Sequence, residues 1–444
     1  MEFSAFTLAV LPRCRSLLHQ LLQLSLLGLL VGVACWPFNL LDRWQDGLLQ
    51  RLPAFSGSAW QPHTLLLALA PVLVVPVLLV LQRGPLLAGA GSGIPQTIAS
   101  IEDPLRARQL LGLGPSLQRC LLWSLATLSL LPLGREGPVV QVGAAVARWL
   151  RGRYPHWLPD LSHADLLAVA AGAGLAAGFD TPLVGVLFVA EEFTSRFTAA
   201  LLWPAMVICA VAASFSNLTG QPEFALGTLG VEPIQLIQVL WAVPIGALAG
   251  LLGAVFGWLL LAATRRCVQI GRRWPLRLGI VLGAALSLLI WLSGGAGGGD
   301  GEALLALLLS GQQAHGLMTA GLGGQLLTLL LRVVGPVLAL ACGIPGGLID
   351  PAISFGAILG QTLAGAAGAP TLGLALGMAA GLAGATQLPV VSVAFCLRLA
   401  GDQQLLPGLV VAAVLAALVS RQLLRQPIYH ALADATGFAS QRPA

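Results

Sequence analysis

Long apolar stretches recur along the whole chain, and polar or charged residues separate them. A helix that crosses a bilayer needs ~20 predominantly apolar residues. Each stretch is close to that length or longer, so each predicts a membrane-spanning helix. The stretches cover residues 16–36, 64–82, 109–133, 199–215, 235–263, 277–293, 318–342 and 404–420.

Shorter apolar segments lie between these stretches, and glycine or proline bounds them. They are too short to span a bilayer comfortably. Such segments are expected where half-helices end inside the membrane and direct their termini at a substrate. The segments cover residues 139–150, 166–178, 183–190, 352–366, 371–385 and 389–399.

An internal repeat relates the two parts of the chain. Residues 134–138 (Gly-Arg-Glu-Gly-Pro) and 347–351 (Gly-Leu-Ile-Asp-Pro) are each followed by Gly-Ala five residues later. Residues 174–188 and 381–395 also share several glycine, proline, valine and phenylalanine positions at identical spacing, in the same order. We infer two homologous halves.

The repeat predicts a single domain. We expect an all-α transmembrane transport domain over residues 1–444, with halves near 16–195 and 199–425 and short cytoplasmic tails at both ends. In transporters built from such repeats, the substrate site lies between the halves near the middle of the membrane. The pattern alone leaves open whether the halves are parallel or inverted.

Composition points to the same class of protein. Of the 444 residues, 57% are hydrophobic and only 9% are charged, whereas a water-soluble surface needs far more charge. We therefore expect a multi-pass protein in the lipid bilayer of the cell, or inner, membrane. The net charge of +5 is small for this length and does not indicate nucleic-acid binding.

Charge and cysteine usage add two expectations. The chain has no lysine, and arginines cluster near residues 13–15, 148–153 and 265–277. These clusters predict the cytoplasmic face, because positive charge is enriched there. The seven cysteines show no paired spacing, and we expect neither a metal nor a cofactor.

Three glycine-rich segments, residues 91–95, 134–138 and 343–351, each end in a proline placed to open a helix. The first N–H groups of a helix lack intrahelical partners and carry part of the positive end of the helix dipole. Glycine lets the backbone approach an anion, and proline at the first turn removes only a spare donor. The segments predict weak binding of a small anion, as transport requires.

Glu136 lies between the glycines of the second segment. An ionisable residue in an apolar membrane region is costly and is therefore a candidate functional residue. Its carboxylate can compete with an anion for the same N–H groups, and protonation removes the competition. Glu136 is thus a candidate gate that links anion binding to protonation. The alternative is a helix-capping glutamate whose charge Arg135 balances.

Three more polar residues stand at the ends of apolar runs. Glu191 and Glu192 are placed to take up a proton from the cytoplasm, and the alternative is a pair of interfacial carboxylates. Tyr429 follows the last apolar run. Its hydroxyl can donate to an anion, or the residue can anchor the helix at the membrane interface.

Taken together, the segments at 91–95, 134–138 and 347–351 and the late Tyr429 resemble the CLC family of chloride channels and transporters, over roughly residues 16–435. The resemblance implies an all-α fold of two inverted halves with many broken or re-entrant helices. It implies a homodimer with one pore per subunit. It also implies a chloride/proton antiporter, which is not an enzyme, with chloride and protons as its transported ligands.

The resemblance also implies a central chloride site. The hydroxyls of Ser92 and Tyr429 and the backbone amides of Leu348 and Ile349 are expected to hold the ion. Ser92, where nitrate-preferring members have proline, implies a preference for chloride.

An outer anion site and two proton-transfer residues follow from the same resemblance. The amides from Arg135 to Gly137 are expected to line the outer site. Glu136 is expected to be the external gating glutamate, and Glu192 the internal glutamate that receives protons. Members with both glutamates are usually exchangers.

Three residues depart from the family pattern. Gln96 stands where many relatives have an acidic residue, and Ile349 replaces the usual phenylalanine. Backbone amides survive any side-chain change, so anion coordination should persist. Asp350 is the third departure, and an ionised carboxylate there would repel an anion. We expect it to point away, to be hydrogen-bonded or to hold its proton.

Other functions remain open at this stage. A passive chloride channel of the same architecture differs only in lacking obligatory proton movement, and Glu136 with Glu192 favours the exchanger. A fluoride-exporting relative fits Ser92 and Tyr429 less well. A remote alternative is an intramembrane hydrolase with Ser92 as nucleophile, which would need a base at the same depth.

Overall fold

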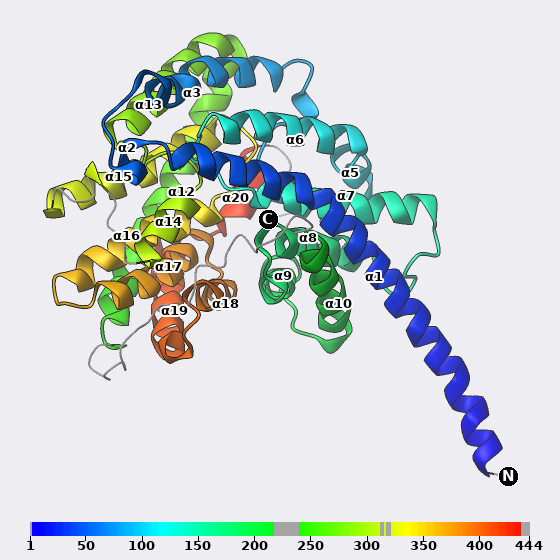
Figure 1. Cartoon of the computed structure of the whole chain (residues 1–444). Helices are drawn as coiled ribbons and strands as arrows, with labels where there is room; N and C mark the ends of the chain where they lie inside the picture. The colour runs from blue at the N-terminus through cyan, green and yellow to red at the C-terminus, as the bar shows by residue number, and fades with distance from the viewer. Residues whose placement is uncertain (1, 217–238, 311–314, 317–320, 437–444) are drawn as a thin grey trace.

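The protein is a bundle of long and short helices (Figure 1). The structure, a computed structural model, describes residues 2–216, 239–310, 315–316 and 321–436, with side chains from residue 15 onward. The helices before residue 217 are α1 (Glu2–Leu49), α2 (Pro53–Ser56), α3 (Pro62–Leu81), α4 (Ile94–Glu102), α5 (Pro104–Leu110), α6 (Leu113–Leu128), α7 (Glu136–Arg153), α8 (His163–Phe179), α9 (Pro182–Phe188) and α10 (Ala199–Ser216).

A second series of helices follows residue 238, and short turns of other helix types complete the fold. The α-helices are α12 (Ala242–Arg273), α13 (Pro275–Leu292), α14 (Glu302–Leu309), α15 (Gly321–Ala341), α16 (Ile349–Gly365), α17 (Pro370–Thr386), α18 (Pro389–Ala400), α19 (Leu406–Leu423) and α20 (Ile428–Ala435). The other turns are η1 (Leu87–Gly89), η2 (Val189–Phe193) and η4 (Gln403–Leu405).

Seven segments of the described chain are long and apolar enough to cross a membrane. They are Arg15–Leu49 within α1, then α3, α10, α12, α13 and α15, and finally Gln403–Ala435, which includes α19. They overlap seven of the eight predicted stretches. The starts of two of these stretches, at residues 235–238 and 318–320, lie outside the described residues. The chain is thus a multi-pass membrane protein.

The prediction of one spanning helix over residues 109–133 is wrong. The chain instead forms α5 and α6, with extended backbone at Gly112 between them. Pro115 causes the break, because proline has no N–H to donate to the carbonyl of residue 111 and is tolerated only in the first turn of a helix. α6 then ends at Leu128, so no described helix covers the whole predicted stretch.

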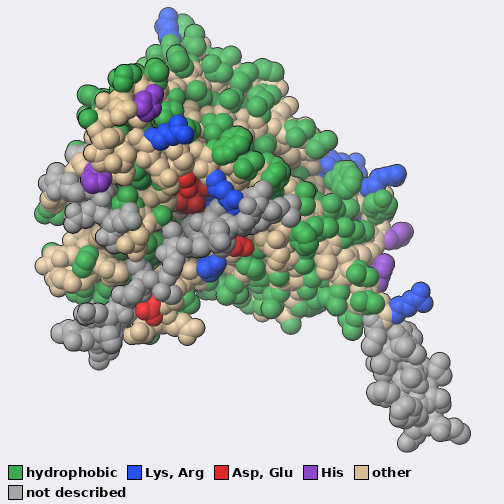
Figure 2. All heavy atoms as spheres, viewed as in Figure 1, with side chains coloured by type: hydrophobic (Ala, Val, Ile, Leu, Met, Phe, Trp, Pro, Cys, Tyr) green, Lys and Arg blue, Asp and Glu red, His purple; other side chains and the backbone are tan. Residues whose placement is uncertain are grey.

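The exposed surface has the character expected of a lipid-facing protein. Large apolar side chains such as Leu73 on α3, Trp258 on α12 and Val281 on α13 point outward and are more than half exposed. Figure 2 shows hydrophobic side chains over much of one face of the molecule. A water-soluble monomer rarely exposes apolar area on this scale.

The short helices pack in pairs, and corresponding glycines hold each pair together. On α7 and α8, a Cβ added to Gly143 would meet the backbone of Gly174 at 3.1 Å. On α16 and α17, a Cβ added to Gly356 would lie 2.7 Å from the Cα of Gly381. These glycines occupy equivalent positions of the sequence repeat. Small residues allow such close approach of membrane helices, so the two halves use the same packing device.

Candidate functional site

The two repeat-related glycine segments meet each other across the halves. Gly134 N–H donates to the carbonyl of Gly347 at 3.1 Å, and Gly347 N–H donates to the carbonyl of Gly134 at 2.8 Å. This antiparallel bridge sets the starts of α7 and α16 side by side. Both helices carry proline in the first turn, where the lost donor is spare. Two helix N-termini therefore converge in the interior.

Glu136 begins α7, but its side chain reaches across to α16. The residue is fully buried, and its Oε1 accepts a hydrogen bond from the backbone N–H of Asp350 at 2.8 Å. The carboxylate also lies against Gly347, where an added Cβ would collide with it. Glycine at this position therefore makes room for the acid. The Glu136 carboxylate occupies the N-terminus of a helix from the other half of the chain.

The first-turn amides of α16 belong to Leu348, at the helix cap, and to Ile349 and Asp350. In an α-helix these N–H groups have no intrahelical acceptor. The side chains of Leu348 and Ile349 are buried. Replacement of the family's phenylalanine by Ile349 thus alters the side chain without removing the backbone donor. The hydrogen bond from the Asp350 N–H to the Glu136 side chain shows that a carboxyl oxygen fits at this helix start.

Arg135 is the residue before Glu136, and its guanidinium serves other partners. It is fully buried, forms an ion pair with Asp42 and a second with Glu302 at 2.9 Å, and donates to the carbonyl of Gly178 at 2.7 Å. In the alternative interpretation, Arg135 balances the charge of Glu136. In the structure, the Arg135 guanidinium instead pairs with the carboxylates of Asp42 and Glu302. These buried pairs fix the backbone at the start of α7.

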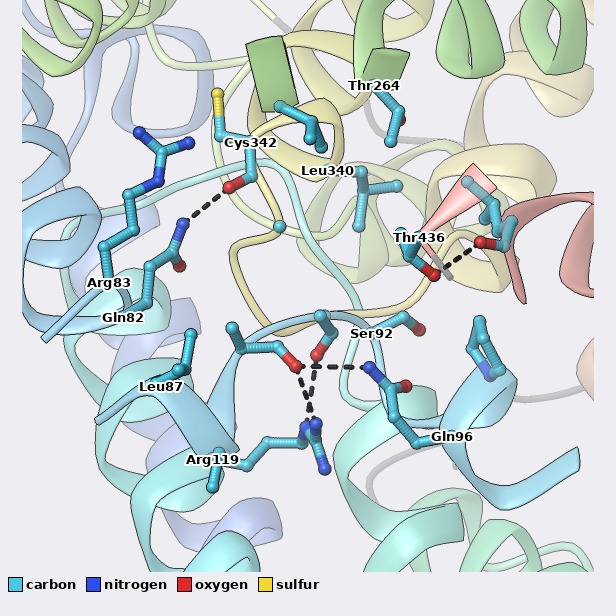
Figure 3. Close-up of a pocket in the computed structure, with 18 of the residues that line it drawn as sticks. Gln82, Arg83, Leu87, Ser92, Gln96, Arg119, Thr264, Leu340, Cys342 and Thr436 are labelled. Carbon is cyan, nitrogen blue, oxygen red and sulfur yellow. Dashed lines mark hydrogen bonds between the residues drawn. The ribbon is translucent and has the colours of Figure 1, made fainter. Parts of the chain in front are cut away.

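The first glycine segment packs against the same place. An added Cβ at Gly137 would lie 2.6 Å from the hydroxyl of Ser92. The segment is held by Arg119, which donates to the carbonyls of Ala90 at 2.8 Å and Gly91 at 3.1 Å (Figure 3). Ser92 therefore lies in direct contact with the backbone that follows Glu136.

Gln96 has a structural role that explains its departure from an acidic residue. Its Oε1 accepts from the N–H of Gly93 at 2.9 Å, and its Nε2 donates to the carbonyl of Ala90 at 3.2 Å (Figure 3). A carboxylate could accept the first bond but could not donate the second. The Gln96 side-chain amide thus holds the backbone of residues 90–93 in place before α4.

A cavity of about 940 Å³ opens in front of Ser92 (Figure 3). Its lining includes Leu348 and three arginines, Arg83, Arg119 and Arg272. Arg272 belongs to the arginine cluster that predicts the cytoplasmic face. Guanidinium groups attract anions toward the cavity, and the cavity leads to Ser92 and to the residue that caps α16.

Tyr429 lies deep in the protein at the start of α20. It is fully buried, and its ring packs edge-on against Phe188 with ring centroids 6.4 Å apart. Within the described part of the chain its hydroxyl has no hydrogen-bond partner. A buried hydroxyl without a partner is costly and is available to donate to an anion.

The structure gives Glu191 and Glu192 different surroundings. Glu191 accepts hydrogen bonds from the N–H groups of Val390 at 3.1 Å and Val391 at 2.8 Å, so it caps the first turn of α18. Glu192 is 5% exposed, and its Oε1 lies 3.6 Å from Nε2 of His430. Both glutamates lie in η2, a turn of π-helix, and such turns often occur at functional sites.

Glu192 borders a second, smaller hollow. This hollow has a volume of about 400 Å³, and its lining includes Glu192, His430 and Glu102. The residues that line it differ from those that line the 940 Å³ cavity. The sequence prediction missed His430 as a neighbour of Glu192, although its position directly after Tyr429 offered a signal.

The predicted site residues therefore form two groups. Ser92, Gly137, Glu136, Leu348 and Ile349 lie together where α4, α7 and α16 begin. Glu192 lies in a separate hollow together with His430, the residue that directly follows Tyr429. The Arg135 side chain points into a cluster of acids, so only its backbone belongs to the first group.

Helix N-termini that converge beside a buried carboxyl group are typical of membrane proteins that move small anions. Comparison with known proteins narrows this class. The family model for the voltage gated chloride channel matches residues 72–421, and the chain therefore belongs to this family. The resemblance seen in the glycine segments is thus confirmed.

Two similar proteins come from bacteria. The chain is 29% identical over 442 residues to the H(+)/Cl(-) exchange transporter ClcA of Cronobacter sakazakii, which covers 95% of this chain and 90% of that protein. It is 30% identical over 370 residues to the protein of the same name from Vibrio parahaemolyticus, with 78% and 74% covered.

Solved structures confirm the fold. A slow cyanobacterial Cl-/H+ antiporter superposes with a TM-score of 0.76 at 22% identity, over 95% of this chain and 98% of that chain. A CLC-type fluoride/proton antiporter superposes with a TM-score of 0.71 at 25% identity, over 90% and 95%. The chain thus has the CLC fold of two inverted halves with broken helices.

The hydrolase alternative gains no support from the surroundings of Ser92. A serine nucleophile needs a base within hydrogen-bond reach. Among the described residues that line the cavity in front of Ser92, there is no histidine, aspartate or glutamate.

Proposed function

We propose that the protein is a secondary transporter that exchanges chloride for protons. The observation that carries the proposal is the position of the Glu136 carboxylate, which accepts from the amide of Asp350 at the start of α16. A transported anion would bind to the same cluster of amides. The carboxylate and the anion therefore compete for one place.

Competition links the two transported species. When Glu136 takes up a proton it loses its negative charge, and its attraction to the α16 N-terminus weakens. An anion can then occupy the amides, and its departure allows the deprotonated carboxylate to return. Because each species changes the affinity for the other, movement of one down its gradient can drive the other uphill.

Separate openings for the anion and the proton support exchange. The 940 Å³ cavity is lined by arginines and leads to Ser92, whereas the 400 Å³ hollow contains Glu192. Chloride would use the first opening and protons the second. Tyr429, whose side chain is buried, packs against Phe188 and directly precedes His430, the neighbour of Glu192. The relatives named as H(+)/Cl(-) exchange transporters agree with this assignment.

Purified protein in liposomes with a chloride gradient tests the proposal directly. We expect the internal pH to change against the proton gradient while chloride leaves, with a fixed number of protons per chloride. Chloride efflux without any proton movement would instead identify a passive channel of the same fold. A much faster flux of fluoride than of chloride would identify a fluoride exporter.

The proposal also covers assembly and location. We propose a homodimer with one pore per subunit in the bacterial inner membrane, and bacterial relatives support that membrane. Light scattering of the detergent-solubilised protein is expected to give the mass of two chains. The mass of a single chain would contradict the dimer and leave the exchange proposal untouched.

Replacing Gly347 by alanine is expected to displace the gate. The new methyl group would collide with the Glu136 carboxylate, which can move because its side chain is flexible. The number of chloride ions moved per proton should then rise about threefold or more, equivalent to roughly 0.7 kcal/mol. The liposome assay measures this ratio.

A control for this variant is Gly114→Ala on α6, where an added Cβ meets nothing within 4 Å. The control should keep the wild-type ratio. A folded Gly347→Ala protein with the wild-type ratio would show that the carboxylate does not need its place beside Gly347.

A further inference from the structure

Asp350 is a buried acid for which the exchange mechanism above has no use. It lies in the first turn of α16 and is 1% exposed. Its backbone N–H holds Oε1 of Glu136, yet its own Oδ2 has no hydrogen-bond partner among the residues that the structure describes. The sequence expectation of a hydrogen-bonded side chain is therefore not met at this oxygen.

The charged surroundings of Asp350 are mostly acidic. Among the described residues, the charged groups near it include three acids, Glu136 on α7, Glu302 on α14 and Asp300 in the loop before α14, and the cation Arg135. Arg135 is already paired with Asp42 and Glu302. An ionised Asp350 would thus be a second buried charge beside the Glu136 carboxylate. Buried charges without a partner are unfavourable, and the group neutralises instead.

We propose that Asp350 is a second proton-binding site, which exchanges its proton with Glu136. This inference rests on the proposed chloride/proton exchange. In the transfer, the O–H bond of the Asp350 carboxylic acid breaks and a new O–H bond forms on the Glu136 carboxylate. The negative charge moves from Glu136 to Asp350, so atoms and charge balance. Oε2 of Glu136 has no hydrogen-bond partner among the described residues and can accept the proton.

Two of the acids near Asp350, Asp300 and Glu302, lie just before a residue that lines a further hollow. Asp300 accepts from the N–H of Glu302 at 2.9 Å through Oδ1, and its Oδ2 has no described partner. Glu302 begins α14, and the next residue, Ala303, lines a hollow of about 450 Å³ together with Asp46. Because Glu136 itself is fully buried, Asp350 offers its proton a first step along this series of acids.

The test compares wild type with Asp350→Asn in the liposome assay. Asparagine has nearly the same shape but carries no exchangeable acid proton, so protons moved per chloride are expected to fall at least about tenfold. The pH profile gives a second readout. In wild type, rising pH ionises Asp350 beside the anion site and slows chloride efflux, and this slowing should be weaker in Asp350→Asn.

A matched control is Ser354→Ala, one turn further along α16. Ser354 is 1% exposed, and its hydroxyl donates to the carbonyl of Pro351 at 3.2 Å. The control should keep the wild-type proton-to-chloride ratio and pH profile. If Asp350→Asn does not fold, Asp350→Ala removes the same acid with a smaller side chain.

The outcomes separate the two proposals. Wild type without proton movement would overturn the exchange function whatever Asp350 does. Suppose that wild type exchanges chloride for protons and that Asp350→Asn has the same proton-to-chloride ratio and pH profile. This result would overturn only the proposal of a second proton site.

Discussion

Replacing Glu136 by glutamine is expected to abolish proton movement while chloride still crosses the membrane. Glutamine is neutral and cannot bind a proton at neutral pH. It therefore cannot alternate between a carboxylate that holds the α16 amides and an acid that leaves them. Protons moved per chloride should fall at least about tenfold, because the group that transfers the proton is gone. Internal pH and external chloride, followed together in liposomes, give the ratio.

A control must lose the same charge at a place without a role in transport. Asp160→Asn is suitable, because Asp160 is exposed on the surface. This variant should exchange chloride for protons like wild type. Uphill proton movement in Glu136→Gln would show that another acid is the gate, and loss of both fluxes in a folded protein would show that Glu136 is needed for the pore itself.

The fold was predictable wherever local residues decide the structure. Proline and glycine mark helix ends in the sequence, so the expected segment 389–399 is α18 (Pro389–Ala400), and 371–385 is α17 (Pro370–Thr386). The prediction of one helix over 109–133 is wrong for a related reason, because Pro115 lies in the first turn of α6. Hydrophobicity alone does not reveal such a break.

Contacts between distant parts of the chain could not be predicted in this way. Asp42 lies 93 residues from Arg135, and Glu302 lies 167 residues away. No local pattern links these residues, so the sequence offered only Glu136 as a neighbour for Arg135. The bond from Glu136 to Asp350, 214 residues apart, is different. The repeat predicted a substrate site between the halves, and both residues belong to the glycine-rich segments that were expected to line it.

The adjacent glutamates also show that contacts between distant segments are not visible in the local sequence. Glu191 and Glu192 are equivalent in sequence, and both were candidates for proton uptake. Their roles differ because α18 of the other half offers two N–H groups to Glu191 alone. Glu192 is left beside His430 in the 400 Å³ hollow. The family resemblance implies proton transfer by Glu192, and the arrangement of the two halves gives the physical reason for the difference.

This difference leads to a matched pair of variants, Glu192→Gln and Glu191→Gln. Glu192→Gln is expected to lower protons moved per chloride at least about tenfold, because it removes the acid that receives protons from the hollow. Glu191→Gln should keep the wild-type ratio. It should lower the unfolding temperature of the purified protein, because loss of a helix cap typically costs about 1 kcal/mol.

The pair is informative because the two changes are chemically identical and one residue apart. A general effect of lost charge at this end of α9 would lower the ratio in both variants equally, and would contradict a specific role for Glu192. A lowered ratio in Glu191→Gln alone would assign proton transfer to the helix cap. If only Glu192→Gln loses proton coupling and only Glu191→Gln loses stability, the two residues have separate roles. Glu192, which is buried beside His430, then carries the proton, and Glu191 stabilises the start of α18.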